Sequence, residues 1–211
     1  MNPACLLCQH TFTGQYLASE EFSFFECPNC GIVFKSPSIF LNRTEEKKRY
    51  LKHENRVDDE GYRAFVSPVV EHILANFDPA KKGLDFGAGP GPVVAKMLNE
   101  KGYKVDLYDP FFYPNKDALH NTYDFIFCCE VIEHFHSPAS EFKLLRKLLN
   151  SKGSLICMTH LLPKKESFSD WYYKNDSTHV VFYSIKSIKW IQENFGFSQV
   201  SIDDRLIVFR D

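Results

Sequence analysis

The chain has 211 residues, of which 44% are hydrophobic and 25% are charged, and its formal net charge is −2. This composition is typical of a globular protein, and the small net charge gives no general attraction to nucleic acid or to an anionic membrane. No run approaches the roughly 18 apolar residues that span a bilayer, and the N-terminus lacks the apolar core of a signal peptide. The seven cysteines are an odd number, and a cytosolic chain would keep them reduced. We therefore expect a cytoplasmic protein.

Two pairs of cysteines come first along the chain. Cys5 and Cys8 form one C-x2-C pair, and Cys27 and Cys30 form another after eighteen intervening residues. Two residues between cysteines make a tight knuckle that directs both thiolates to one ion, and this spacing is typical of a zinc ribbon. We therefore predict a structural zinc ion held by four sulfurs in residues 1–36. Because about 35 residues bury too little core to fold alone, the metal would supply the missing stability.

The rest of this module offers two short predicted strands, 22–25 and 32–34, and almost no basic surface. Lys35 is the only lysine or arginine among the first 35 residues, which argues against strong binding of phosphates. The module is still a candidate docking surface for a protein or an RNA. The alternative to a zinc ribbon is a set of reduced core cysteines without a metal.

Residues 37–80 are predicted to form a linker followed by helices. Thr44 is a candidate cap for a charged helix over residues 45–50. A later set of apolar residues recurs at helical spacing and predicts one buried helix face: Val66, Val69, Val70, Ile73, Leu74 and Phe77. Pro68 falls inside this run, so we expect either a new helix start or a kink there.

A glycine-rich turn between a strand and a helix is the most informative feature of the chain. The predicted strand 83–86 contains Asp85 and runs into Gly87-Ala88-Gly89-Pro90-Gly91, and a helix is predicted over 92–101. Glycines suit such a turn because its backbone angles oppose a Cβ and because a ligand must approach the main chain closely. The next strand, 104–108, ends at Asp109, where nucleotide-binding α/β folds place an acid that binds ribose hydroxyls.

The run Asp85-Phe86-Gly87-Ala88-Gly89-Pro90-Gly91 resembles motif I of the class I S-adenosylmethionine (SAM) methyltransferases, Asp/Glu-x-Gly-x-Gly-x-Gly. The dinucleotide fingerprint G-x-G-x-x-G fits less well, because its third glycine falls on Pro92 and because an acid would repel a pyrophosphate. The sulfonium and amino groups of SAM are compatible with that acid.

This resemblance implies SAM as the cofactor and assigns its contacts along the first two strands. Gly87, Ala88, Gly89 and Gly91 would lie under the methionine part of SAM. Asp85 would orient that part directly or through water. Asp109, followed by Pro110, would hold the ribose.

The cysteine module followed by the patterns Arg49-Tyr50-x2-His53-x-Asn55 and Asp59-x-Gly61-Tyr62-x2-Phe65 resembles an uncharacterised bacterial subgroup of the same family. In class I methyltransferases such N-terminal helices cover the cofactor. Tyr50, His53 and Tyr62 are therefore either packing residues or contacts to cofactor or substrate.

The predicted strand 123–128 and the residues after it resemble a second methyltransferase motif, Tyr/Phe-Asp-x-Ile/Val-x4-Val-x-Glu-His. The resemblance implies that Cys129 and Glu130 lie beside the cofactor. Only fourteen residues separate Asp109 from Asp124, too few for a full strand and helix. We therefore expect the third strand of the fold to be short or missing, which leaves the adenine contact unassigned.

Glu130, Glu133 and His134 form the pattern E-x2-E-H. On a helical turn these positions share a face, and carboxylates with an imidazole suit Mg, Mn or Fe. The same pattern occurs in the ubiquinone-biosynthesis O-methyltransferases and in the small-RNA 3′-terminal 2′-O-methyltransferases, where a downstream histidine completes a metal site; here His179 would complete it. The alternatives are His134 or His179 as general base, or ordinary packing of each residue.

The remaining residues complete a Rossmann-like, doubly wound α/β sheet. After a predicted helix, 138–149, and strand, 154–158, the aromatic-rich loop 171–176 is a candidate substrate wall. A helix over 185–194 capped by Ser184 precedes strands 199–202 and 206–209. Such a terminal antiparallel hairpin distinguishes class I methyltransferases from dehydrogenases. The expected division is a zinc ribbon, 1–36; a linker with cofactor-covering helices, 37–80; and a SAM-dependent methyltransferase domain, 81–211.

The function that follows is methyl transfer from SAM to an oxygen or carbon atom of a small molecule. One alternative is an RNA methyltransferase, including a metal-assisted 2′-O enzyme, whose zinc ribbon contacts RNA. A second alternative is a non-catalytic protein that binds SAM or interacts with partners through its ribbon.

Overall fold

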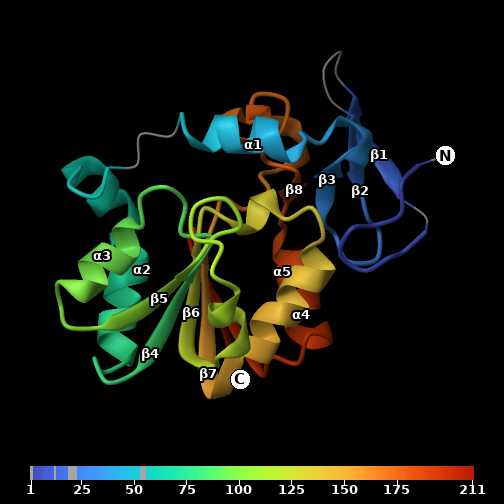
Figure 1. The fold of residues 1–211 in the computed structure, drawn as a ribbon. Helices are drawn as coiled ribbons and strands as arrows, with labels where there is room; N and C mark the ends of the chain where they lie inside the picture. Colours follow the sequence, from blue (N-terminus) through green and yellow to red (C-terminus); the bar gives the residue numbers. More distant parts are fainter. Residues whose placement is uncertain (1, 12, 19–22, 53–55) are drawn as a thin grey trace.

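Two β-sheets organise the chain in the computed structural model, which describes residues 2–11, 13–18, 23–52 and 56–211 (Figure 1). The larger sheet has six strands in the order β5-β4-β6-β7-β10-β9. The four parallel strands are β4 (Lys82–Phe86), β5 (Lys104–Tyr108), β6 (Tyr123–Cys129) and β7 (Leu149–Met158). The hairpin of β9 (Gln199–Asp203) and β10 (Leu206–Arg210) joins them antiparallel through β10 and β7. The doubly wound sheet with its terminal hairpin is therefore confirmed.

Strand β5 forms one edge of this sheet. Within the described residues no strand lies outside β5, and the stretch before β6 contains only the short 3-10 helix η2 (Lys116–His120). The short spacing between Asp109 and Asp124 predicted this, because so few residues cannot supply both a strand and a crossover helix.

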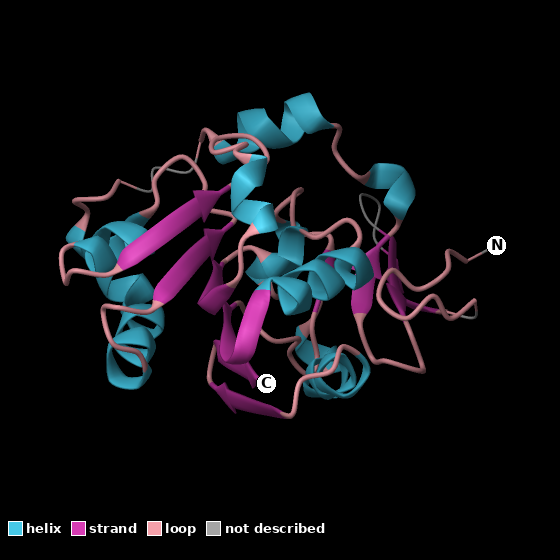
Figure 2. Cartoon of the chain, turned by 60° about the horizontal axis from the view of Figure 1, so that its bottom comes forward, coloured by secondary structure: helices cyan, strands magenta, loops and turns pink. Residues whose placement is uncertain are grey.

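Helices cover both faces of the larger sheet, as the turned view in Figure 2 also shows. Alternation along β6 divides the core, since successive side chains point to opposite faces. Phe125 and Phe127 pack with α2 (Glu60–Asn76) and α3 (Val93–Asn99). Ile126 and Cys128 pack on the other face with α4 (Pro138–Leu148) and α5 (Ile185–Asn194).

The smaller sheet has the strand order β1-β2-β3-β8 and joins two distant parts of the chain. Its first three strands are β1 (Gly14–Ala18), β2 (Ser23–Glu26) and β3 (Val33–Lys35). The fourth, β8 (Val181–Phe182), follows the aromatic loop and pairs antiparallel with β3. Residue 22, the first of the predicted strand 22–25, lies outside the described residues.

The helices that follow the N-terminal strands in the chain differ from the sequence expectations in two respects. The cap of α1 (Arg43–Tyr50) is Asn42 rather than Thr44, because the Asn42 side chain accepts hydrogen bonds from two backbone N–H groups and Glu45 completes a capping box. Helix α2 continues through Pro68, so no new helix starts there. Its buried face holds Val66, Val69, Val70 and Ile73, whereas Leu74 is 38% exposed.

Short 3-10 helices complete the chain: η1 (Pro37–Ile39), η3 (Ile132–His134), η4 (Lys165–Ser167) and η5 (Tyr172–Asn175). In Figure 1, α1 lies across the upper edge of the larger sheet, between the N-terminal strands and the side that carries α2 and α3. Among the residues that the structure describes, no helix is long and apolar enough to cross a membrane.

Candidate functional site

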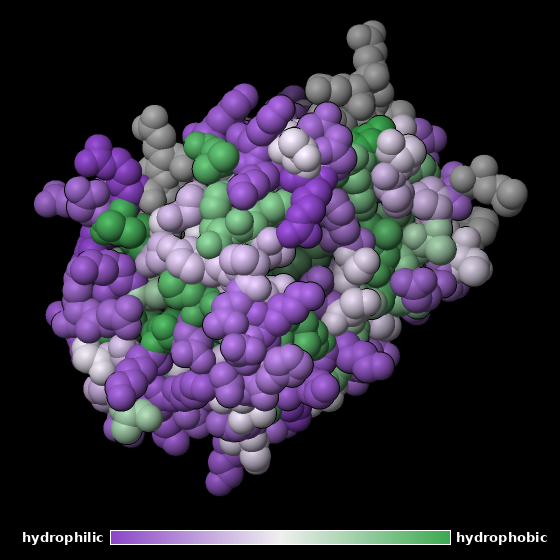
Figure 3. Space-filling view, viewed as in Figure 1, coloured by the Kyte–Doolittle hydropathy of each residue, from purple (hydrophilic) through white to green (hydrophobic). Residues whose placement is uncertain are grey.

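A cavity of about 970 Å³ lies at the carboxyl ends of the parallel strands, bordered by α1. Figure 3 shows a hollow near the middle of this face, with polar and apolar residues mixed around it. The carboxyl ends of parallel strands are where open α/β sheets bind ligands. All nine predicted cofactor contacts line this cavity together with both predicted catalytic histidines: Asp85, Gly87, Ala88, Gly89, Gly91, Asp109, Pro110, Cys129, Glu130, His134 and His179.

The glycine-rich turn needs its glycines for two different reasons. Gly87 has φ +87°, and a Cβ there would lie 2.6 Å from both methyl groups of Val131. Gly89 has φ +59°, but its Cβ would meet no atom within 4 Å. Gly87 is therefore required by packing, whereas Gly89 keeps the cavity floor open to a ligand.

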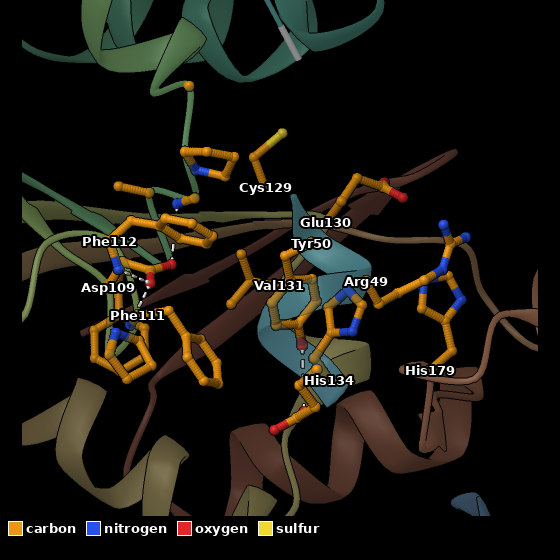
Figure 4. A pocket seen from close by; sticks show the side chains of 18 of the residues that line it. Arg49, Tyr50, Asp109, Phe111, Phe112, Cys129, Glu130, Val131, His134 and His179 are labelled. Atoms are coloured by element: carbon orange, nitrogen blue, oxygen red, sulfur yellow. Dashed lines mark hydrogen bonds between the residues drawn. The ribbon is translucent and has the colours of Figure 1, made fainter. Parts of the chain in front are cut away.

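Asp109 ties the glycine turn to the loop after β5. One carboxylate oxygen accepts hydrogen bonds from the backbone N–H groups of Phe111 (2.7 Å) and Phe112 (2.9 Å). The other accepts from the N–H of Gly89 at 3.0 Å. Figure 4 shows these bonds on one side of the cavity. The carboxylate thus organises the backbone on this side, and its remaining lone pair is the one that a ribose hydroxyl would use.

Asp85 lies at the end of β4 with 5% of its surface exposed. Burial, and next the charge of Asp109, raise its pKa well above the usual value. A cationic ligand atom beside Asp85 would oppose both effects. The turn and this acid therefore fit a ligand that carries positive charge near Gly87 and Gly89.

Glu130 occupies an unusual position directly after β6. Its backbone has φ +52°, uncommon for a residue with a Cβ. Its Oε2 accepts a hydrogen bond from the Tyr173 hydroxyl at 3.1 Å, and its Oε1 is buried without a hydrogen-bond partner among the described residues. Burial, followed by the charge of Glu133, raises the pKa of Glu130 to about 8. A buried acceptor without a partner beside a cavity is suited to a ligand donor.

Glu133, His134 and His179 place one ligand atom each within 4.8 Å of one another. His134 Nδ1 donates to the backbone oxygen of Thr178 (2.9 Å), and His179 Nδ1 donates to that of Tyr173 (2.8 Å). Because a carbonyl oxygen only accepts, each neutral ring carries its proton on Nδ1 and its lone pair on Nε2. Metal-binding histidines are commonly oriented in this way, with one ring nitrogen bound to a carbonyl and the other left for the ion.

The electrostatics keep both rings neutral near pH 7. Burial, and then the neighbouring His134, lower the pKa of His179 to about 3, and burial also lowers the pKa of His134. Burial raises the pKa of Glu133 to about 7, although the Tyr173 hydroxyl at 2.6 Å and Thr159 donate to its carboxylate. Neutral imidazoles beside a carboxyl group are able to bind a cation or to accept a proton from a bound hydroxyl.

The spacing of the E-x2-E-H residues predicted that they share one helical face. In the structure they do not. The 3-10 helix η3 begins only at Ile132, and the positive φ of Glu130 turns that residue away from the helix. The potential ligand group consequently contains Glu133, His134 and His179, whereas Glu130 lies outside it and binds Tyr173 instead.

Helix α1 closes the cavity on the side of the histidines. Arg49 forms an ion pair with Asp176 at 2.6 Å, and the Tyr50 ring contacts the His134 ring edge-to-face with centroids 5.3 Å apart. Figure 4 shows Arg49, Tyr50, His134 and His179 on the side of the cavity opposite Asp109, with Val131 between the two groups. His53 and Asn55, which belong to the predicted lid pattern, lie outside the described residues.

The four cysteines of the N-terminal pairs converge as their spacing predicted. The Sγ atoms of Cys5 and Cys30 are 3.5 Å apart, those of Cys8 and Cys27 are 3.4 Å apart, and all four lie within 4.8 Å of one another. Sulfurs at the corners of a tetrahedral zinc site are about 3.8 Å apart for bonds of about 2.3 Å. The donor set and its geometry therefore fit zinc.

Three parts of the site were missed or left open at the level of sequence. Tyr173, one of several aromatics in its loop, bridges Glu130 and Glu133. Phe111 and Phe112 line the cavity beside Asp109, and their position just after Asp109 and Pro110 was a usable signal. Arg49 reaches Asp176, 127 positions later in the chain, and no local pattern indicates such a pairing.

Comparisons with known proteins agree with this geometry. The sequence matches the family described as "Methyltransferase domain" over residues 59–202. It is 32% identical over 77 residues to the ubiquinone biosynthesis O-methyltransferase of Pectobacterium atrosepticum, an alignment that covers 36% of this chain and 32% of that protein. The chain thus spans about a third of the length of that curated relative.

Solved structures of other proteins resemble the fold, including the following two. An O-methyltransferase family protein from Burkholderia thailandensis has a TM-score of 0.54 at 11% identity, covering 78% of this chain and 61% of that one. The pyocyanin biosynthetic protein PhzM has a TM-score of 0.51 at 15% identity, covering 77% and 61%. At such low identity the likeness establishes the fold alone.

Proposed function

The chain belongs to the methyltransferase-domain family and has its class I, Rossmann-like fold, and we propose that it transfers the methyl group of SAM to an oxygen atom of a small molecule. The observation that carries this proposal is a cavity with two chemically different sides. One side has the open glycine turn with Asp85 and Asp109, and the other has two neutral histidines beside Glu133.

The side of the cavity with the glycine turn, Asp85 and Asp109 is the donor side, and it provides a binding surface for a cationic ligand that carries a ribose. The open space over Gly89 admits the ligand against the backbone, and Asp85 would attract its amino group or sulfonium. Asp109 would accept from a ribose hydroxyl with its remaining lone pair while it holds the turn in place. Bound SAM supplies an electrophilic methyl group, so these residues mainly fix its position for an in-line displacement.

On the acceptor side, Nε2 of His134 or His179 would accept a hydrogen bond from the acceptor hydroxyl and take up its proton during transfer. The new O–CH3 bond replaces the S–CH3 bond, so the sulfonium becomes a neutral thioether and one proton leaves the acceptor. The Pectobacterium relative is an O-methyltransferase by name, which supports oxygen as the methylated atom.

A second candidate, metal-assisted O-methylation, is favoured by the way the histidines are fixed. Both rings donate Nδ1–H to backbone carbonyls and keep Nε2 for a ligand, next to the Glu133 carboxylate. Two imidazoles and a carboxylate suit a divalent ion such as Mn²⁺ or Fe²⁺, which when bound would lower the pKa of the acceptor hydroxyl. Glu133, His134 and His179 would hold it.

The N-terminal module is proposed to bind a structural zinc ion through Cys5, Cys8, Cys27 and Cys30. An RNA acceptor finds no support in this module, because its sole lysine or arginine through residue 35, Lys35, is 1% exposed and its ammonium donates to the oxygen of Asp176. A buried ammonium does not reach a phosphate backbone.

Calorimetric titration of SAM into zinc-loaded protein, with and without Mn²⁺, tests the proposal. We expect binding with one site per chain, followed by product formation in a screen of hydroxylated small molecules with methyl-labelled SAM. Absence of binding by both SAM and its demethylated product at millimolar concentration would leave a non-catalytic interaction protein as the better description. Mn²⁺ binding and Mn²⁺-dependent product formation that are both lost in Glu133→Gln would favour the metal-assisted reaction.

A further inference from the structure

The segment 173–182 separates the histidine side of the cavity from the N-terminal module. It supplies His179 itself and the two carbonyls, of Tyr173 and Thr178, that fix the tautomers of His179 and His134. The backbone N–H of Val180 also donates to the oxygen of Glu133 at 2.9 Å. The orientation of all three residues in the ligand group therefore depends on where this segment lies.

The N-terminal module holds this segment through its backbone and its core. Strand β3 follows the second cysteine pair and pairs with β8, and Lys35 N–H donates to the oxygen of Val180 at 2.9 Å. The Tyr173 ring belongs to the same apolar cluster as Tyr16, Phe24 and Val33 of the module. The side chain that bridges Glu130 and Glu133 thus shares an apolar cluster with residues from the other end of the sequence.

Lys35 adds a polar contact at the start of the segment. Its side chain is buried, and its ammonium group donates to the backbone oxygen of Asp176 at 2.6 Å. Asp176 in turn accepts from the N–H and hydroxyl of Thr178 and from Arg49 of α1. Burying an ammonium group is costly, and an apolar residue of equal length would fill the same space. Packing alone therefore does not require a lysine at this position.

We propose that Lys35 is a positioning residue for the acceptor side of the cavity. Its ammonium group fixes the carbonyl of Asp176 and thereby the turn that presents the Thr178 oxygen to His134 and the His179 ring to the cavity. The cysteine module is then a structural part of the methyl-acceptor site and not an appended docking surface. The acceptor role of this side rests on the proposed function, whereas the positioning itself does not.

The test compares Lys35→Met with the native, zinc-loaded protein. Met keeps the length and the apolar stem but removes the donor. We expect the imidazole ¹H–¹⁵N correlations of His134 and His179 to change from one Nδ1–H tautomer to a mixture, and kcat to fall at least tenfold. The SAM dissociation constant should stay within twofold, because Lys35 does not line the donor side.

Lys186→Met is the matched control. The Lys186 ammonium also crosses between the module and the larger domain, donating to the oxygen of Pro28 at 2.5 Å, but its bond is exposed and does not involve the 173–182 segment. We expect it to leave the imidazole signals unchanged. If Lys35→Met and Lys186→Met lower the thermal midpoint equally and both keep the native tautomers, the role of Lys35 is merely structural.

If Lys35→Met does not fold, Lys35→Arg takes its place in the test. Arginine keeps a cation and N–H donors at a displaced position, so its imidazole signals should lie between those of the native protein and those of a tautomer mixture. Native tautomers in Lys35→Met, or in Lys35→Arg where only that variant folds, would overturn the positioning role. This result is separable from failure of the proposed function, which would instead appear as absence of SAM binding in the unaltered protein. Tautomers that shift without any change in kcat would also overturn the proposal, since the segment would then not serve the reaction.

Discussion

The described residues contain two clusters of potential metal ligands that differ in chemistry and in access. The N-terminal cluster has four sulfur atoms, three of its cysteines are buried, and its donor set already completes a tetrahedron. The second cluster has one carboxylate and two imidazoles, and its histidines line a large cavity. In the proposed function the two clusters have different roles: the closed sulfur site stabilises the fold, and the open site, whose ligands are harder, leaves a position for a substrate.

The two clusters are nevertheless not independent. Strand β3 leaves the cysteine cluster and pairs with β8, two residues after His179. The Cys5, Cys27 and Cys30 side chains also share one apolar core with the strands and helices of the larger sheet. We therefore expect damage at the closed site to reach the open one, whereas changes at the open site should leave the closed one intact.

The largest expected effect is loss of the closed site. Cys27→Ser should release zinc and lower the free energy of unfolding by about 3–5 kcal/mol, since structural zinc provides much of the stability of so small a module. For a chain of this size that is a fall of about 10 °C in the thermal midpoint. The check is thermal unfolding together with metal analysis. Cys157→Ala, at a fully buried cysteine outside the cluster, is the control; equal losses in both would mean that the four cysteines are ordinary core residues.

Substitution of His179 should affect the reaction and not the fold. In His179→Asn the amide replaces Nδ1–H, so the bond to the Tyr173 oxygen is kept while Nε2 is lost. We expect turnover with the best acceptor from the screen to fall about a hundredfold, a usual size for loss of a proton acceptor. His179→Gln, whose amide extends to the Nε2 position, should lose less. Steady-state kinetics decide, and equal activity of the Asn variant and the native protein would remove His179 from the mechanism.

Asp109→Ala should weaken SAM binding by about 1–3 kcal/mol, because three backbone N–H groups lose their acceptor and the ribose loses its partner. Asp106→Ala provides the comparison, as Asp106 lies on β5, three residues before Asp109, but accepts from Tyr123 away from the cavity. Titration calorimetry measures both. An unchanged SAM affinity in Asp109→Ala would reject the ribose role of Asp109.

The open site should also give the metal-free protein a distinctive pH dependence. The folded pKa values of Glu133, about 7, and Glu130, about 8, lie above the unfolded value, so the folded state binds more protons in the window from about 4.5 to 8. Their contribution is fully present below pH 4.5 and is lost as the pH rises through the folded pKa values of about 7 and 8. Below about pH 6.5 the buried neutral histidines act in the opposite direction.

Denaturant unfolding between pH 7 and 8 emphasises the carboxyl effect, since the histidines are mostly neutral in both the folded and the unfolded state there. Stability should fall across this range, and less steeply in Glu133→Gln, which cannot titrate. A native protein whose stability does not fall with pH in this window would show that the two carboxyl groups are ionised throughout, as they would be around a bound cation.

The smallest expected change concerns the donor side. Gly89 and Gly102 both have positive φ and open space where a Cβ would lie, but only Gly89 lines the cavity. Alanine at either position should therefore destabilise the protein by about 1 kcal/mol. SAM affinity should fall in Gly89→Ala and remain unchanged in Gly102→Ala. Equal affinities in the two variants would place the ligand elsewhere in the cavity.

Local chemistry in the sequence determined much of this protein. The C-x2-C spacing brings the four sulfurs together, the glycines with Asp85 and Asp109 define the donor side, and Ser184 caps α5 in a capping box. Each depends on neighbours within a few residues, or on strands whose carboxyl ends must meet at one edge of a parallel sheet. The fourteen residues between Asp109 and Asp124 predicted a short or missing third strand, and among the described residues no strand lies outside β5.

Only the tertiary structure decided how the two ends of the chain build the acceptor side. The pairing of β3 with β8 and the contact of Lys35 with Asp176 join residues that are between 141 and 149 positions apart. The bridge of Tyr173 between two carboxyl groups, and the positive φ that removes Glu130 from the ligand group, depend on packing around a single buried turn. Such contacts leave no periodicity or spacing in the sequence, because they form where the surfaces of separate elements meet. Each element would have the same sequence pattern if the contact were absent.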